Sequence, residues 1–192
     1  MSKARLEAFS DGVFAILITI LVLELKVPHG DDWAVVKPLV PVFLTYVLSF
    51  IYLGIYWNNH HHMLHAADRI TGKVLWPNLH LLFWLSLVPF TTGWMGENHF
   101  APLPTAVYGF VLFMAGVAFT ILERVLVSQQ APGSRLAAAL GGDDTKEHLS
   151  MAAYAAAIPL AFVSHWISNA LYVAVALMWL VPDPRIESKI SR

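Results

Sequence analysis

Charge-free apolar stretches recur along the chain and are separated by short polar segments. The first runs from Gly12 to Leu23 and contains one polar side chain, Thr19. Since about twenty apolar residues cross the hydrocarbon core of a bilayer as a helix, the pattern predicts a single all-α domain of six membrane-spanning helices. Their predicted ranges are residues 3–27, 38–64, 73–96, 103–128, 146–163 and 166–182.

The last apolar stretch, from His148 to Pro182, allows one long span or two short ones. One helix over its 35 residues would be about 52 Å long, against a core of about 30 Å. Two spans need a tight turn near Ser164-His165-Trp166. Charge placement favours two, because cytoplasmic loops collect Lys and Arg.

With six spans, both termini and the loops after spans two and four share one side of the membrane. That side then carries ten of the twelve basic residues, against Lys26 and Lys37 on the other. With five spans the division is seven against five. We therefore predict six spans with both termini cytoplasmic; the ten residues are Lys3, Arg5, Arg69, Lys73, Arg124, Arg135, Lys146, Arg185, Lys189 and Arg192.

Composition agrees with an integral membrane protein. The chain is 57% hydrophobic and 13% charged, with a mean hydropathy of +0.60, whereas soluble domains carry about 25% charged residues. A net charge of −1 gives no basic excess for a nucleic-acid partner. The absence of cysteine excludes disulfides, thiolate metal sites and Cys nucleophiles.

The N-terminal helix could be a signal peptide, a plain anchor or a working part. Glu7 and Asp11 interrupt its basic start, and no Ala-x-Ala-like site follows Leu23, so we expect it to be retained. Asp11 lies where the helix enters the membrane, and a charge there needs a partner or water. We predict a network of Arg5, Ser10 and Asp11 with cytoplasmic-end residues of the second and third helices; the candidates are Trp57, Asn58, His61, His62, Asn78 and His80.

Four histidines, His60, His61, His62 and His65, lie within six residues. His61 and His65 are four apart, so they share a helix face, and such a pair can bind a divalent metal. However, no His-Glu-x-x-His motif occurs, and the other histidines do not repeat the spacing. We predict no metal centre and give the cluster a structural or proton-sensitive role.

The sequence lacks the residues that are usual in enzymes and in ion-coupled transporters. There is no Gly-x-Ser-x-Gly elbow and no P-loop. No predicted span carries paired carboxylates at its centre, although coupled transporters usually need ionisable groups deep in the bilayer. We predict that the protein is not an enzyme and needs no cofactor.

One motif connects the chain to a known family. Arg5-x-x-x-Phe9-Ser10-Asp11, followed by Gly12-Val13-Phe14-Ala15-Ile16 and an apolar run with Thr19, resembles the transmembrane protein 175 family of potassium-permeable channels. The length and the six apolar stretches agree over essentially the whole chain. The resemblance implies a homotetramer in the prokaryotic plasma membrane that conducts potassium and other monovalent cations. It also implies that Phe9, with Ser10 and Asp11, binds the first helix to its neighbours.

The first helix carries an aliphatic stripe of Ile16, Ile20 and Leu23, with Thr19 on its flank. Spacing alone shows that these residues share a face of the helix. An aliphatic face of this kind is also typical of a helix that packs against its neighbours and lines no pore. The resemblance implies that the first helices of four subunits surround the pore. It makes Ile16 the narrowest ring, Leu23 an outer apolar ring and Thr19 a polar layer linked to selectivity.

A conventional carbonyl filter is not present, because Thr91-Thr92-Gly93-Trp94 does not match Thr-Val-Gly-Tyr-Gly. The sequence therefore predicts a cation channel with a hydrophobic constriction. Glu24, Asp31 and Asp32 lie toward the outer side, where carboxylates can concentrate cations. Two alternatives stay open: a small-molecule or metal-ion transporter built on the histidine cluster, and a non-conducting membrane scaffold or sensor.

Overall fold

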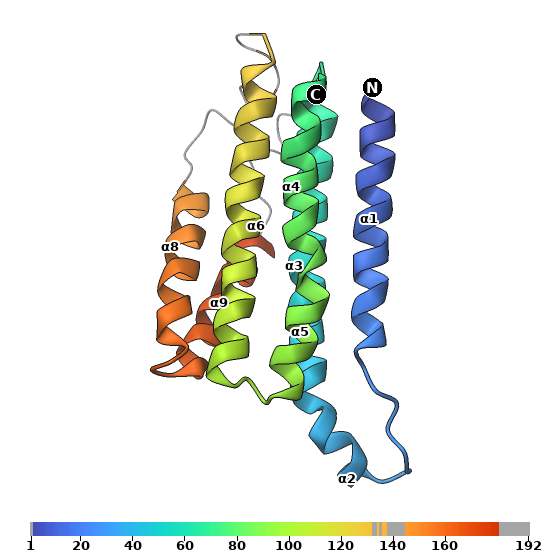
Figure 1. The fold of residues 1–192 in the computed structure, drawn as a ribbon, viewed down its shortest axis with the longest axis vertical. Coiled ribbons are helices and arrows are strands. Elements are labelled where there is room, and N and C mark those ends of the chain that lie inside the picture. Colours follow the sequence, from blue (N-terminus) through green and yellow to red (C-terminus); the bar gives the residue numbers. More distant parts are fainter. Residues whose placement is uncertain (1, 132–133, 135, 138–144, 181–192) are drawn as a thin grey trace.

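The computed structural model describes residues 2–131, 134, 136–137 and 145–180, and the regular secondary structure within those ranges is entirely helical (Figure 1). Most helices run side by side along the long axis of the molecule. In chain order the elements are α1 (Lys3–Leu23), α2 (Trp33–Val36), η1 (Lys37–Leu39), α3 (Val40–Ala66), η2 (Gly72–Val74), α4 (Leu75–Ser86), α5 (Val88–Glu97), α6 (Pro102–Ser128), α8 (Thr145–Leu160) and α9 (His165–Leu180).

Four helical segments of the described residues are long and apolar enough to cross a membrane: Lys3–Leu23, Trp33–Ala66, Gly72–Glu97 and Pro102–Ser128. Helices α8 and α9 have 16 residues each and are about 24 Å long at 1.5 Å per residue. A turn over residues 161–164 joins them, so the apolar stretch after His148 forms two helices. The prediction of an all-helical membrane protein is confirmed.

Several sequence predictions fall outside the described residues. They concern the connection between the fourth and fifth predicted spans at residues 132–133, 135 and 138–144, and the end of the last predicted span at 181–182. Four of the basic residues that were assigned to the cytoplasmic side also lie there: Arg135, Arg185, Lys189 and Arg192.

Two local features were not foreseen from the sequence. A short arm of α2 and η1 precedes α3 and extends beyond the end of the bundle (Figure 1). The third span consists of two helices, because α4 ends at Ser86 and α5 begins at Val88, with Pro89 in its first turn. Proline has no N–H to donate and its ring clashes with the carbonyl four residues earlier, so the helix is interrupted there.

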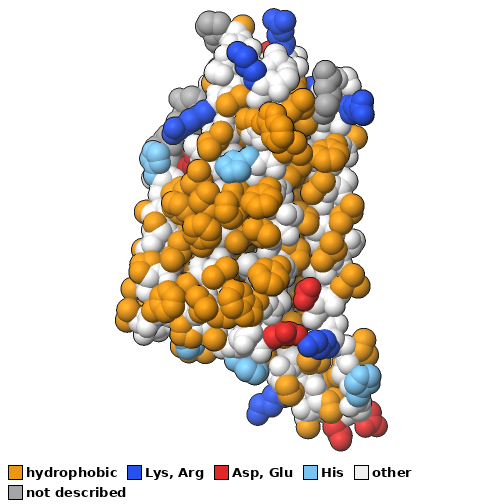
Figure 2. Space-filling view, viewed as in Figure 1, with side chains coloured by type: hydrophobic (Ala, Val, Ile, Leu, Met, Phe, Trp, Pro, Cys, Tyr) orange, Lys and Arg blue, Asp and Glu red, His pale blue; other side chains and the backbone are white. Residues whose placement is uncertain are grey.

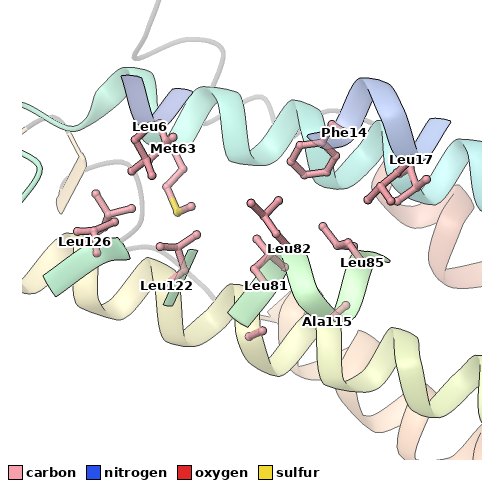
Figure 3. Close-up of a cluster of buried hydrophobic side chains, with 14 of the residues drawn as sticks. Leu6, Phe14, Leu17, Met63, Leu81, Leu82, Leu85, Ala115, Leu122 and Leu126 are labelled. Atoms are coloured by element: carbon pink, nitrogen blue, oxygen red, sulfur yellow. The ribbon is translucent and has the colours of Figure 1, made fainter. Parts of the chain in front are cut away.

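The main core lies between α1, α3, α4 and α6 (Figure 3). Leu6, Phe14 and Leu17 of α1 point toward α4, and Leu81, Leu82 and Leu85 of α4 fill the space between α1 and α6. In a membrane this packing is stabilised by close van der Waals contact, because lipid tails are as apolar as leucine.

A second core contains tyrosines and joins α3, α6, α8 and α9. The Tyr172 hydroxyl donates to the Thr105 carbonyl at 3.0 Å, and the Tyr52 hydroxyl donates to the Tyr172 carbonyl at 2.6 Å. Tyr108 meets Tyr172 edge to face, with ring centroids 5.6 Å apart. These bonds satisfy polar groups that have no water partner at this depth.

The surface divides along the long axis. Hydrophobic side chains cover the middle of the molecule, and Lys and Arg gather at the end where α1 begins (Figure 2). Many large apolar side chains are exposed along the helices, including Phe43, Phe50, Phe83, Phe90, Phe162 and Leu177. Exposure on this scale fits a lipid environment.

At that basic end, two polar side chains tie the helix termini together. The Lys3 amine donates to the carbonyls of His65 and Ala67 at the end of α3, at 2.7 and 3.0 Å. The Gln130 side chain accepts from the backbone N–H groups of Asp68 and Arg69 and donates to the Arg69 carbonyl. The turn between α3 and η2 is therefore held by both α1 and the end of α6.

Gly109 allows α6 and α9 to approach closely, and this contact is testable. A Cβ at position 109 would lie 2.0 Å from the Tyr172 hydroxyl oxygen. We expect Gly109→Ala to displace Tyr172 and to lower the free energy of unfolding by about 1–3 kcal/mol, the usual cost of overpacking. Gly54→Ala is the matched control, since nothing lies within 4 Å of its added Cβ. Thermal unfolding in detergent checks the pair, and equal stabilities would contradict the close approach.

Candidate functional site

Helix α1 has one face inside the bundle and one face free. The inner face consists of Leu6, Ser10, Phe14, Leu17 and Leu21, all of them buried. These residues recur at intervals of three or four, so they form one stripe along the helix. The opposite face is therefore left without a partner in the same chain.

The four residues predicted to line a pore lie on that free face. Ile16 is 58% exposed, Ile20 is 37% exposed and Leu23 is 78% exposed. Thr19 is exposed between them, and its hydroxyl donates to the Ile16 carbonyl at 2.8 Å. Because the hydroxyl hydrogen is used within the helix, the oxygen can still accept a bond or coordinate a cation.

A buried polar cluster attaches the first part of α1 to α3 and α4. The Asn78 amide donates to the Ser10 hydroxyl at 3.0 Å, and the Asn78 carbonyl oxygen lies 2.7 Å from Nε2 of His60. Ser10, His60 and Asn78 are each at most 1% exposed. The short contact requires the tautomer in which His60 donates from Nε2, since the amide oxygen only accepts.

Asp11 makes a second contact beside this cluster. The indole N–H of Trp57 on α3 donates to Oδ1 of Asp11 at 3.0 Å. The Trp57 ring also stacks on His61, with centroids 5.9 Å apart. Ser10 and Asp11 thus connect α1 to neighbouring helices through adjacent side chains, one buried and one nearer the surface.

The other candidates for this network lie elsewhere. Arg5 and Phe9 are exposed on α1, and Asn58 and His61 are exposed on α3. His62 is half-buried and meets the His61 ring at its edge, with centroids 5.6 Å apart. His80 accepts from the Trp84 indole N–H within α4, at 2.9 Å.

His60 was not among the predicted partners. A signal for it exists in the sequence: the buried residues Leu53 and Leu64 lie seven residues before it and four after it. These intervals place all three side chains on one helix face. Asn78 therefore contacts His60, while His61 and His65 point to the outside of α3.

Charged groups lie at the end of α1 near Leu23. Glu24 lies so close to α5 that a Cβ at Gly93 would be 2.5 Å from its Oε2. Lys26 forms an ion pair with Glu97, with 2.5 Å between Nζ and Oε1. Asp31 and Asp32 are exposed in the loop before α2. Both ends of α1 are thus fixed to the bundle of the same chain.

The family profile described as the endosomal/lysosomal potassium channel TMEM175 matches residues 5–89. A potassium channel of Chryseobacterium sp. (strain P1-3) is 51% identical over 191 residues, which cover 100% of this chain and 99% of the relative. The chain belongs to the TMEM175 family.

Two further comparisons concern Chamaesiphon minutus. A potassium channel of this organism is 31% identical over 189 residues, covering 90% of this chain and 91% of the relative. The crystal structure of a lysosomal potassium-selective channel TMEM175 homolog from the same organism matches with a TM-score of 0.77 and 28% identity. That match covers 93% of this chain and 96% of the other. The shared TMEM175 fold thus extends over nearly the whole chain.

The Asp11–Trp57 contact predicts a specific mutational coupling. We expect Asp11→Ala and Trp57→Phe each to destabilise the protein by about 1 kcal/mol, because each removes the same hydrogen bond. The double variant should cost little more than either single variant in a double-mutant cycle. Thermal unfolding and the fraction of intact oligomer measure the effect.

We also expect Asp11→Ala to damage assembly more than ion selectivity, because its carboxylate contacts α3 and not the free face of α1. A stable oligomer of this variant with altered selectivity would contradict the packing role. Additive effects of the two substitutions would show that the hydrogen bond does not couple them.

Proposed function

We propose that this chain is a potassium-permeable channel whose pore is lined by the free face of α1. The observation that carries the proposal is the exposed stripe of Ile16, Ile20 and Leu23 with Thr19, on a helix whose opposite face is buried. The relatives named as potassium channels, at 51% and 31% identity, support the same assignment.

A pore along α1 requires several copies of the chain. The free face of α1 is open to the outside of its own bundle, so a single chain cannot enclose an ion path there. Homo-oligomers usually close around a symmetry axis, and copies of α1 around such an axis would enclose the stripe. We propose a homotetramer, the assembly that the resemblance to the family implies.

In this arrangement Ile16 forms the hydrophobic constriction. A ring of aliphatic side chains can exclude water below a limiting diameter and thereby control ion passage. The Thr19 oxygens, one turn further along, would supply a polar layer for a partly dehydrated cation. Potassium loses its hydration shell more readily than sodium, so such a layer would favour potassium.

The distribution of charge supports cytoplasmic termini. Six basic residues of the described chain belong to the end where α1 begins: Lys3, Arg5, Arg69, Lys73, Arg124 and Lys146. The Lys3 bonds to the end of α3 connect two of these segments directly. Lys26 and Lys37 belong to the opposite end, so the positive-inside rule favours a cytoplasmic start for α1. We propose a multi-pass protein of the prokaryotic plasma membrane.

The constriction is tested by Ile16→Asn in a planar lipid bilayer, with potassium on one side and sodium on the other. We expect the wild type to give a potassium-biased reversal potential and the variant a current at least several-fold larger, because the amide hydrates the narrowest ring. Leu177→Asn is the matched control, since Leu177 of α9 is also 58% exposed but lies away from the proposed axis.

The control separates a pore-lining residue from a lipid-facing one. Equal currents from the Ile16 and Leu177 variants would overturn the assignment of Ile16 to the constriction. No current from any of the three proteins, with the oligomer intact, would overturn the channel and leave the transporter and the scaffold as explanations.

The polar layer is tested separately by Thr19→Val. Valine has nearly the shape of threonine but no oxygen, so we expect the potassium-to-sodium permeability ratio to fall several-fold while current persists. Thr19→Ser keeps the hydroxyl and should retain most of the preference. An unchanged ratio in Thr19→Val would exclude Thr19 from selectivity.

A further inference from the structure

A pair of histidines on the surface of α3 lies outside the buried cluster of Ser10, His60 and Asn78 that attaches α1. His61 and His65 are both exposed and lie one turn apart. Their rings are nearly parallel, with an interplanar angle of 16° and centroids 6.1 Å apart. Because both side chains are at the surface, the rings can turn without disturbing the core.

This arrangement matches a general way of binding transition metals. Two imidazoles at positions i and i+4 of a helix can direct one nitrogen each toward a single ion. Neutral imidazole is a good ligand for Zn²⁺, Ni²⁺ and Cu²⁺, with nitrogen–metal distances of about 2.0–2.1 Å for zinc. Small side-chain rotations would bring the two nitrogens into that range, and water would complete the coordination.

We propose that His61 and His65 form a two-histidine surface site for a divalent transition metal ion on α3. This site is not a catalytic metal centre of the kind that the sequence argues against. It needs only two protein ligands and performs no catalysis. No group of three or more His, Asp or Glu among residues 2–131, 134, 136–137 and 145–180 is placed to hold a metal. The proposed site therefore has two protein ligands.

The neighbouring histidine has a different function. His60 is buried, about 100° around α3 from His61, and is engaged with Asn78. Substitution of His61 or His65 therefore leaves the polar cluster that attaches α1 unchanged. This separation makes both residues suitable for mutation without unfolding the bundle.

The site is connected to α1 through one stacked ring. His61 stacks on Trp57, and Trp57 donates to Asp11 of α1. An ion that turns His61 toward His65 therefore changes the packing of the indole that holds Asp11. Metal binding would thus act on the first part of α1.

The site is tested with Ni²⁺ on the full-length protein, after removal of any histidine tag and of bound metal by a chelator. We expect isothermal titration to give at least tenfold weaker binding for His61→Ala and for His65→Ala than for wild type. His29→Ala is the matched control, because His29 is exposed in the loop before α2, and it should bind as the wild type does. Equal affinity in all four proteins would overturn the proposal.

A second measurement locates the ion without any use of channel activity. Cu²⁺ bound at this pair should quench the fluorescence of Trp57, so titration of wild type should show a quenching step that is absent in Trp57→Phe and in His61→Ala. Identical quenching curves for wild type and Trp57→Phe would overturn the assigned position. Neither titration depends on the proposed potassium conduction, so failure of one proposal is distinguishable from failure of the other.

Discussion

The arrangement of the helices depends on the buried hydrogen bonds that attach α1 to the bundle, where water does not compete for the polar groups. Ser10, Asn78 and His60 are buried and satisfy one another. In the apolar part of a membrane an unpaired polar group costs several kcal/mol. The cluster therefore restricts rotation of α1 about its own axis, because turning the helix would break the hydrogen bond between Ser10 and Asn78 and leave the Ser10 hydroxyl without this partner.

A fixed rotation determines which residues of α1 face outward. With Ser10 directed at Asn78, helix geometry directs Phe14, Leu17 and Leu21 into the core and Ile16 and Ile20 away from it. Hydrophobicity alone could not make this distinction, since both faces of α1 are aliphatic. One buried polar residue thus selects which aliphatic stripe of α1 faces away from the bundle.

The sequence predicted the membrane helices. It did not predict which side chains of a helix face its neighbours, or the short helices that precede α3. Charge-free stretches indicated the helices, because a bilayer excludes charge along the whole length of a span. Trp57 and Asn78, two of the candidate partners, contact Asp11 and Ser10 respectively. The candidate partners included His61 and His62 but not His60, which is the histidine that contacts Asn78. Consecutive residues of a helix point about 100° apart, so an error of one position changes which side chain faces the neighbouring helix. The arm of α2 and η1 has only seven residues, which are too few to show such a charge-free stretch.

The attachment of α1 to its bundle is polar toward both ends of the helix and apolar in its middle. Lys3 is bonded to the end of α3, Ser10 and Asp11 to α4 and α3, and Lys26 to Glu97. Between Asp11 and Glu24 no hydrogen bond or ion pair among the described residues joins α1 to another helix. Ile16 lies in this interval, where only apolar packing holds the helix against its bundle. In the proposed assembly around α1, the width at Ile16 would thus depend on apolar packing within each chain and on contacts between copies.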